Sequence, residues 1–182
     1  MIYAVIGLII VGIIVLAVVL IRKGSDSKPD ITEPDITAEY FRKYNWVEQE
    51  GSYLVLESPT EFKFYRSKDE LDDYYYSGTY EFYSGSKAID EIIDYVEKNL
   101  SDYALTRKEI KKIMARNKEY NVSNFVFFVL NNEAQIVNGE NKIKEAVKTP
   151  YYGFYLKEGS EEALDIANMH TALYILFTPV DK

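Results

Sequence analysis

Four carboxylate side chains fall within five residues in the segment KDELDDYYY, which covers positions 68–76. Carboxylates placed this closely can ligate Ca²⁺ or act as acid and base in hydrolysis. The segment lacks the D-x-D-x-D-G pattern and the distant Glu of a calcium-binding loop. A solvated, tyrosine-rich turn is therefore the favoured interpretation, and we predict no metal and no cofactor. A carboxylate-dependent hydrolase that uses Asp69, Asp72 or Asp73 remains the less favoured alternative.

The chain has one histidine, His170, and no cysteine. The absence of cysteine excludes disulfides, zinc sites with thiolate ligands and cysteine nucleophiles. A catalytic histidine needs a nucleophile and an orienting acid, and the sequence contains no G-x-S-x-G motif and no glycine-rich phosphate-binding motif. We therefore predict that the protein has no catalytic residues and is not an enzyme. His170 is expected to cap the end of a helix.

Charge is divided unevenly along the chain, whose net charge is −8. Residues 37–102 hold seven basic and 15 acidic side chains, whereas residues 103–148 hold nine basic and five acidic ones. Six of those basic residues belong to one predicted helix: Arg107, Lys108, Lys111, Lys112, Arg116 and Lys118.

This basic helix face has three interpretations. The simplest is a solvated face that the preceding acidic helix partly neutralises. The second is a docking face for an acidic protein partner or for anionic lipid head groups. Nucleic-acid binding is not expected, because the domain is acidic and the basic residues are not interleaved with aromatic ones.

Hydrophobic periodicity indicates an α+β domain with a mostly antiparallel sheet and about three to four helices. Helices are predicted at residues 37–44, 87–100, from 106 onward, at 142–148 and at 160–170. A hairpin is predicted at residues 47–56 with its turn near Gly51, and NFVFFVL at residues 124–130 is expected to be a central buried strand. Further strands are predicted at residues 62–66, 79–83, 135–137, 151–156 and 172–177.

The first 23 residues are predicted to be a single transmembrane helix. Residues 2–21 carry no charge, and twenty helical residues span about 30 Å, the thickness of a hydrocarbon core. A cleaved signal peptide and a buried element are the alternatives. Arg22 and Lys23 flank the span on its C-terminal side, which predicts a translocated N-terminus and a cytoplasmic domain.

A polar spacer with two prolines is predicted at residues 24–36, and one folded domain at residues 37–182. Together these features favour a non-enzymatic, membrane-anchored structural or interaction protein within a larger assembly. That assembly is either a virion with a membrane, in which the chain is a minor capsid protein, or a membrane complex. An inhibitor or immunity-type binding protein is the alternative.

Overall fold

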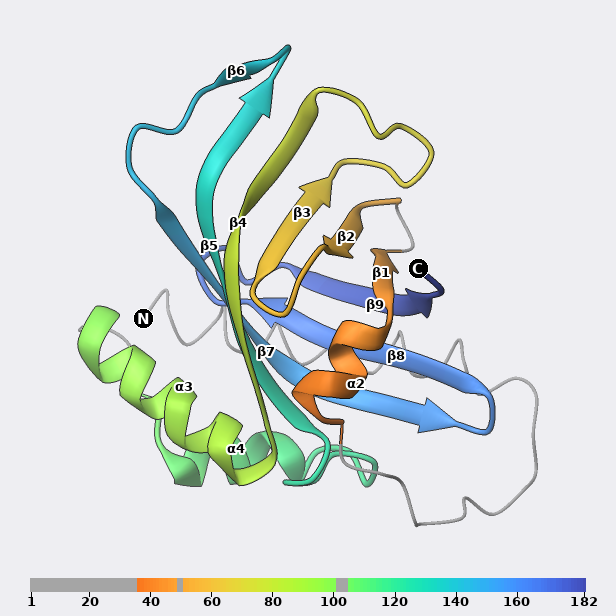
Figure 1. Ribbon diagram of the computed structural model, residues 1–182. Coiled ribbons are helices and arrows are strands. Elements are labelled where there is room, and N and C mark those ends of the chain that lie inside the picture. Colours follow the sequence, from red (N-terminus) through yellow and green to blue (C-terminus); the bar gives the residue numbers. More distant parts are fainter. Residues whose placement is uncertain (1–35, 49–50, 101–104) are drawn as a thin grey trace. The chain divides into compact units, whose positions relative to one another are not determined.

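The computed structural model describes residues 36–48, 51–100 and 105–182. Within these ranges the helices are α2 (Ala38–Lys43), α3 (Gly85–Asn99) and α4 (Arg107–Met114). The strands are β1 (Asn45–Glu48), β2 (Tyr53–Leu56), β3 (Glu61–Tyr65), β4 (Tyr74–Ser84), β5 (Phe125–Val137), β6 (Glu140–Asn141), β7 (Val147–Glu158), β8 (Glu161–Asn168) and β9 (Tyr174–Val180). Figure 1 shows them in sequence colours.

Eight of the described strands close into an antiparallel barrel. Each strand pairs with its neighbours in the order β1, β2, β3, β4, β5, β7, β8, β9, and β9 pairs back with β1. The short strand β6 extends β5 as a hairpin. Closure removes the free edges of the sheet, which would otherwise invite pairing with another chain. The predicted α+β class is therefore wrong, because strands hold 47% of the described residues and helices only 21%.

Two glycines allow neighbouring strands to approach closely in this barrel. A Cβ atom at Gly153 in β7 would lie 2.0 Å from the carbonyl oxygen of Asp165 in β8. One at Gly78 would lie 2.0 Å from the carbonyl oxygen of Asn131, next to a β-bulge where the β4–β5 register shifts. Any larger residue would force these strands apart at both positions.

Aromatic and aliphatic side chains fill the inside of the barrel, as expected for a chain with 17 Tyr and 9 Phe. Helix α2 covers one end, where its Phe41 is fully buried and stacks on Phe82 with ring centroids 4.2 Å apart. The indole Nε1 of Trp46 donates to the carbonyl oxygen of Phe41 at 3.0 Å, which joins α2 to β1. We call this the α2 end of the barrel.

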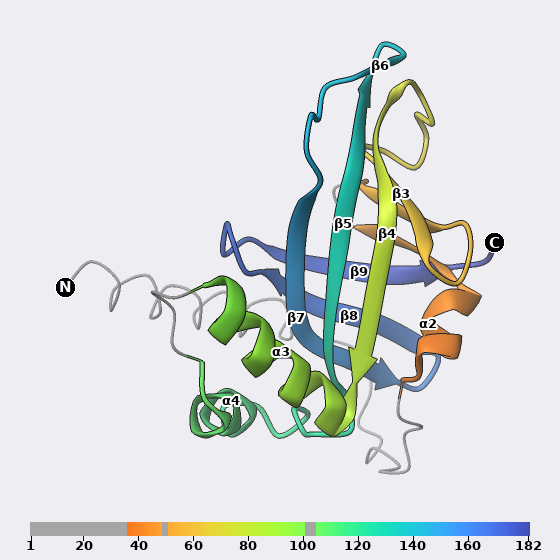
Figure 2. The same cartoon turned by 60° about the vertical axis from the view of Figure 1, so that its left-hand side comes forward.

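Helices α3 and α4 lie on the outside of the barrel. Figure 2 shows α3 crossing the outer side of β4 and β5, with α4 beside it. Phe127 points outward from β5 and contacts Tyr95 of α3, with ring centroids 5.7 Å apart. Its neighbours Val126 and Phe128 point inward and are also buried. The apolar run at residues 124–130 is thus a central strand covered on both faces, as predicted.

Some of the other predicted helices and strands are confirmed, and others are wrong. The β1–β2 hairpin and the helices at α2, α3 and α4 are confirmed, including the capping box of Thr106 and Glu109. The predicted helix at residues 160–170 is wrong, because β8 occupies most of it. Residues 142–146 form no helix, and residues 135–137 continue β5 rather than forming a separate strand.

The predicted anchor at residues 1–23, its flanking residues Arg22 and Lys23, and nearly all of the spacer lie outside the described residues. In the part of the chain that the structure describes, no helix has the length and apolarity needed to cross a membrane.

Candidate functional site

The basic face predicted around α4 is the first candidate site. Thr106 begins the helix: its hydroxyl accepts from the backbone N–H of Glu109, and the Glu109 carboxylate accepts from the backbone N–H of Thr106 at 2.8 Å. This reciprocal cap fixes the first turn. Ile110 and Met114 are buried toward the barrel, so the opposite face of the helix points to solvent.

All six predicted basic residues are exposed, with Arg116 and Lys118 in the turns after the helix. Arg107 pairs with Asp90 of α3. The other five form no ion pair with any described residue: Lys108, Lys111, Lys112, Arg116 and Lys118. Neutralisation by α3 is therefore confined to one exposed pair, and most of the positive charge remains available. We call these five residues the α4 basic face.

The acidic stretch at residues 68–76 divides between a loop and a strand, because β4 begins at Tyr74. Asp72 pairs with Arg66 at 2.9 Å and also accepts from the backbone N–H of Tyr74 at 3.0 Å. Those contacts stabilise the turn. Among the described residues no group of three or more His, Asp or Glu side chains is arranged to hold a metal ion.

His170 lies in the turn between β8 and β9, not at a helix end, so its predicted capping role is wrong. It is exposed, and the hydrogen bonds of the described residues join its backbone N–H to Asn168 but join its ring to no carboxylate. The structure thus does not assemble His170 with Asp69, Asp72 or Asp73 into a catalytic group.

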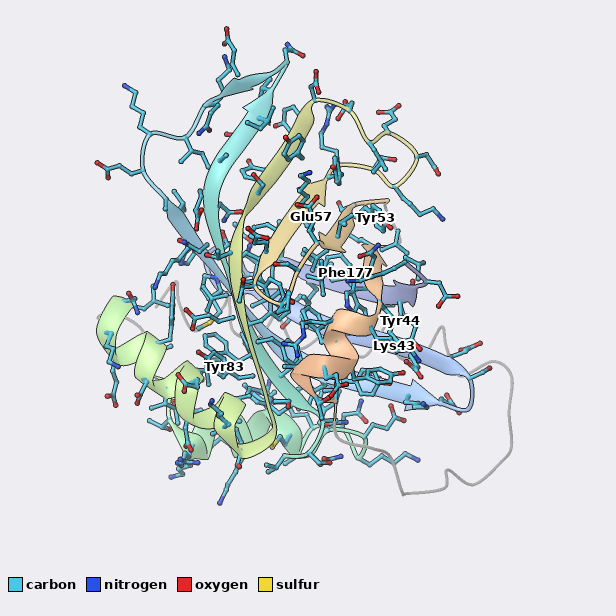
Figure 3. All side chains as sticks on the ribbon, viewed as in Figure 1. Lys43, Tyr44, Tyr53, Glu57, Tyr83 and Phe177 are labelled. Carbon is cyan, nitrogen blue, oxygen red and sulfur yellow. The ribbon has the colours of Figure 1, made fainter. Side chains whose placement is uncertain are left out.

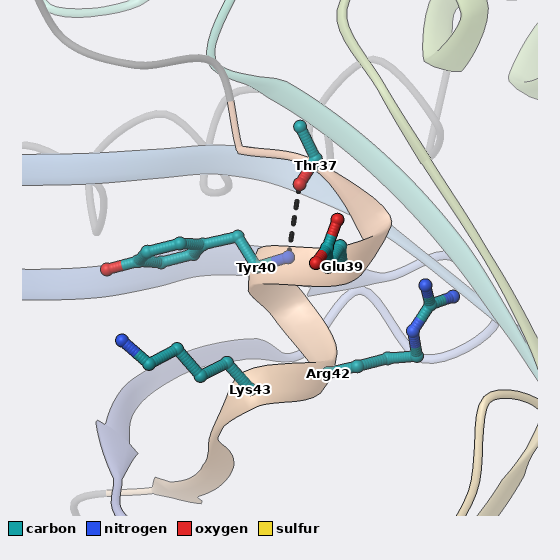
Figure 4. Close-up of a pocket in the computed structure, with 5 residues that line it drawn as sticks. All are labelled: Thr37, Glu39, Tyr40, Arg42 and Lys43. Atoms are coloured by element: carbon teal, nitrogen blue, oxygen red, sulfur yellow. Dashed lines mark hydrogen bonds between the residues drawn. The ribbon is translucent and has the colours of Figure 1, made fainter.

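A shallow pocket of about 470 Å³ lies beside α2 (Figure 4). The described residues that line it all come from this helix or its cap: Thr37, Glu39, Tyr40, Arg42 and Lys43. The Thr37 hydroxyl accepts from the backbone N–H of Tyr40 at 3.1 Å, which is an ordinary helix cap. In the part of the chain that the structure describes, no side chain from a second element lines this pocket.

A polar cluster joins α2 to the β7–β8 hairpin next to this pocket. The Tyr40 hydroxyl donates to Glu162, whose other oxygen pairs with Lys157 at 2.8 Å. These contacts keep the pKa of Glu162 below its usual value, whereas burial, followed by the bond to Glu162, raises the pKa of Tyr40 to about 12. The cluster attaches α2, which covers this end of the barrel, to the β7–β8 hairpin.

A buried carboxyl group that sequence reasoning missed lies on the outer face of β8. Asp165 is only 8% exposed and accepts a hydrogen bond from the Tyr120 hydroxyl at 3.0 Å. The Tyr120 ring stacks on Phe154, with centroids 3.8 Å apart. Burial raises the pKa of Asp165 to about 6, and the bond from Tyr120 opposes that rise. The segment after α4 thereby closes over β8.

No signal in the sequence marked this pair, because Asp165 lay in a predicted helix and Tyr120 in a predicted loop 45 residues earlier. Comparison with known proteins adds no assignment: no family model, no curated protein and no solved structure matches the chain.

Proposed function

We propose that this chain is a non-enzymatic interaction protein, tethered to a membrane by its first 23 residues, whose folded domain binds other proteins of a membrane-associated assembly. The observation that carries the proposal is the α4 basic face. Five cationic side chains project from one short segment of an otherwise acidic protein, and none is paired with a described residue. Such a surface is suited to a partner that supplies the missing negative charge.

The rigid support of this face favours a docking role. Helix α4 is capped at its start, its buried residues Ile110 and Met114 fix its orientation, and the Tyr120–Asp165 bond holds the following segment. A pre-ordered surface loses little conformational entropy when a partner binds.

An acidic protein fits this surface better than an anionic lipid layer. Helix α3 contacts α4 and carries several carboxylates, of which Asp94 and Glu97 are exposed. A uniformly negative membrane would repel these groups while it attracted the lysines. A protein with a localised acidic patch can contact α4 and leave α3 in solvent.

The test is crosslinking of the full chain in its native membrane or particle, followed by mass spectrometry. We expect reproducible crosslinks from Lys108, Lys111 and Lys112 to one or more proteins of the assembly. Replacing all three by Glu removes the crosslinkable amines as well as the charge, so co-purification of the partner, quantified by mass spectrometry, is the readout for this variant, and it should be lost. The control replaces Lys144 and Lys148 by Glu, because these lysines are exposed but lie outside the α4 basic face.

Each outcome bears on the proposal. Crosslinks to several structural proteins support an assembly role, whereas crosslinks to a single soluble target identify the chain as an inhibitor or immunity-type protein. If the triple Glu variant keeps its protein partner but no longer binds vesicles of anionic lipid, the face binds lipid head groups instead, and the proposal of a protein partner is contradicted. Undiminished co-purification of the partner with the triple Glu variant would contradict the proposal.

A further inference from the structure

At the end of the barrel opposite α2, the inward-facing side chains include polar and partly exposed residues. We call the end of the strands with the β3–β4, β5–β7 and β8–β9 connections the loop end; Figure 1 shows the first two of these at the top. Residues paired across an antiparallel ladder project to the same face. Glu48 pairs with Phe177, which is labelled in Figure 3 and belongs to the buried core, so the register places Glu48 on the inner face as well.

The same register places five more side chains on the inner face at the loop end: Phe64, Tyr76, Tyr151, Asn168 and Ile175. All of these but Tyr151 are partly exposed. In contrast, Trp46 and Leu164, which face inward at the α2 end, are fully buried. Solvent therefore reaches the inside of the barrel from the loop end.

These inward groups act on one another across the barrel. The pKa of Tyr151 is raised to about 12, mainly by burial; the hydrogen bond with Asn168 opposes this rise, and the Glu48 carboxylate and Tyr76 add smaller increases. The Tyr76 hydroxyl accepts a hydrogen bond from Gln135 at 2.9 Å. The Tyr151 ring stacks on Phe128 below it, with centroids 5.0 Å apart. Glu48 pairs with Phe177 across the β1–β9 ladder, and the Phe177 ring contacts Phe64 with centroids 6.3 Å apart, so the carboxylate lies beside aromatic rings.

The Glu48 carboxylate has no cationic partner in the described part of the chain. Its backbone is held by the β1–β2 hairpin, where its N–H donates to Ser52 at 2.8 Å, but its side chain takes part in no ion pair or hydrogen bond there. The exposed β3–β4 loop at the same end is acidic overall, because Asp69, Glu70 and Asp73 outnumber Lys68 and the Arg66–Asp72 pair is neutral. A carboxylate beside aromatic faces is the arrangement that attracts organic cations.

We propose that the loop end of the barrel binds an organic cation with a short apolar stem. The positive group pairs with Glu48, and the stem lies against Phe64, Tyr76 and Tyr151. A small amine and a lysine side chain of another protein share this chemistry. The site is separate from the α4 basic face, which has the opposite charge, so either can fail without the other.

The experiment uses the full chain in detergent micelles with ¹³C-labelled tyrosine rings, observed by NMR. The probe is Nα-acetyl-lysine methylamide, and its neutral counterpart is Nα-acetyl-norleucine methylamide. We expect saturable shifts of the Tyr76 and Tyr151 signals, with an affinity for the lysine compound at least tenfold higher. Glu48→Gln should weaken lysine binding roughly tenfold, the effect of losing one charge-assisted contact. Glu145→Gln, at an exposed carboxylate of the same end, is the control.

A second comparison, between a small amine and a lysine-containing peptide, identifies the source of the cation. Butylammonium binding as tightly as the peptide Gly-Gly-Lys-Gly-Gly indicates a small amine, whereas a tenfold preference for the peptide indicates a partner's side chain. Equal binding of the lysine and norleucine compounds would overturn the proposal, as would unchanged binding by a folded Glu48→Gln variant. So would the absence of any tyrosine shift at millimolar probe. Weakening of lysine binding by added salt supplies a second readout on the unmodified protein.

Discussion

The two ends of the barrel differ in what the inward side chains do. At the α2 end, Phe41 and Trp46 are fully buried, and Tyr40 attaches the covering helix to Glu162. At the loop end, Glu48 and Tyr76 face the same interior but remain partly exposed. The difference indicates a division of roles, in which the α2 end supplies stability and the loop end keeps polar groups available for binding.

Truncation of Phe41 is expected to have the largest effect and tests this division most directly. Phe41→Ala should lower the free energy of unfolding by about 3–5 kcal/mol, because it leaves a cavity among Trp46, Phe82 and Phe128. Urea denaturation monitored by Trp46 fluorescence measures this change. Phe64→Ala at the loop end is the matched control and should cost less, because solvent already reaches that ring. Equal losses for the two variants would remove the distinction between the ends.

Asp165, on the outer face of β8, makes the free energy of unfolding depend on pH. Its folded-state pKa is raised from 3.8 to about 6, so the native state binds more protons than the unfolded state between these values. The contribution of Asp165 to stability should therefore be fully present below about pH 4, decrease as the pH rises to 6, and be about 3 kcal/mol smaller above that. Asp165→Asn keeps an acceptor for Tyr120 without the buried charge.

We expect Asp165→Asn to raise the unfolding free energy at pH 7.5 and to flatten its dependence on pH between 4 and 6. Urea titrations at a series of pH values provide the measurement. Asp73→Asn, at an exposed carboxylate in the β3–β4 loop, should leave the profile unchanged. A profile with the same slope in Asp165→Asn would show that this carboxyl group is not the one that titrates.

Sequence periodicity was reliable where an element has one buried face and one exposed face. Helix α3 buries Ile89, Ile92 and Val96 at helical spacing, and it was predicted within a few residues. Strand β8 failed because both of its faces are covered. Leu164 and Ile166 point inward, and Ala163 and Ala167 on the outer face are apolar and buried as well, so buried residues do not alternate with exposed ones and the run resembles a helix.

Barrel closure could not be predicted for a different reason. It depends on the pairing of β1 with β9, more than 120 residues apart, and on the register shift at Gly78. Neither leaves a local pattern. The residues of the α4 basic face were predicted because charge spacing on a helix is local. Glu48 was missed because its inward position follows from the pairing of β1 with β9, which no local pattern predicts.

The polar attachment of α2 should contribute less than the core beneath it. Tyr40→Phe removes the hydrogen bond to Glu162 while it keeps the ring, so we expect a loss of about 1–2 kcal/mol. Tyr95→Phe is the control, because no hydrogen bond joins its hydroxyl to another described residue. Hydrogen exchange should locate the change in α2, with faster exchange of the Phe41 amide. Uniform acceleration throughout the barrel would indicate instead that α2 cannot open separately.

The smallest effect on stability is expected for the exposed ion pair between Arg107 and Asp90. Arg107→Ala breaks the pair with Asp90, but both side chains are more than half exposed, and such pairs contribute about 0–1 kcal/mol. Thermal unfolding should therefore change little. Lys111→Ala should weaken partner binding at the α4 basic face, because it removes a positive charge that no described carboxylate pairs with. A large loss of stability in Arg107→Ala would mean that the basic helix serves the fold, and it would weaken the case for a docking surface.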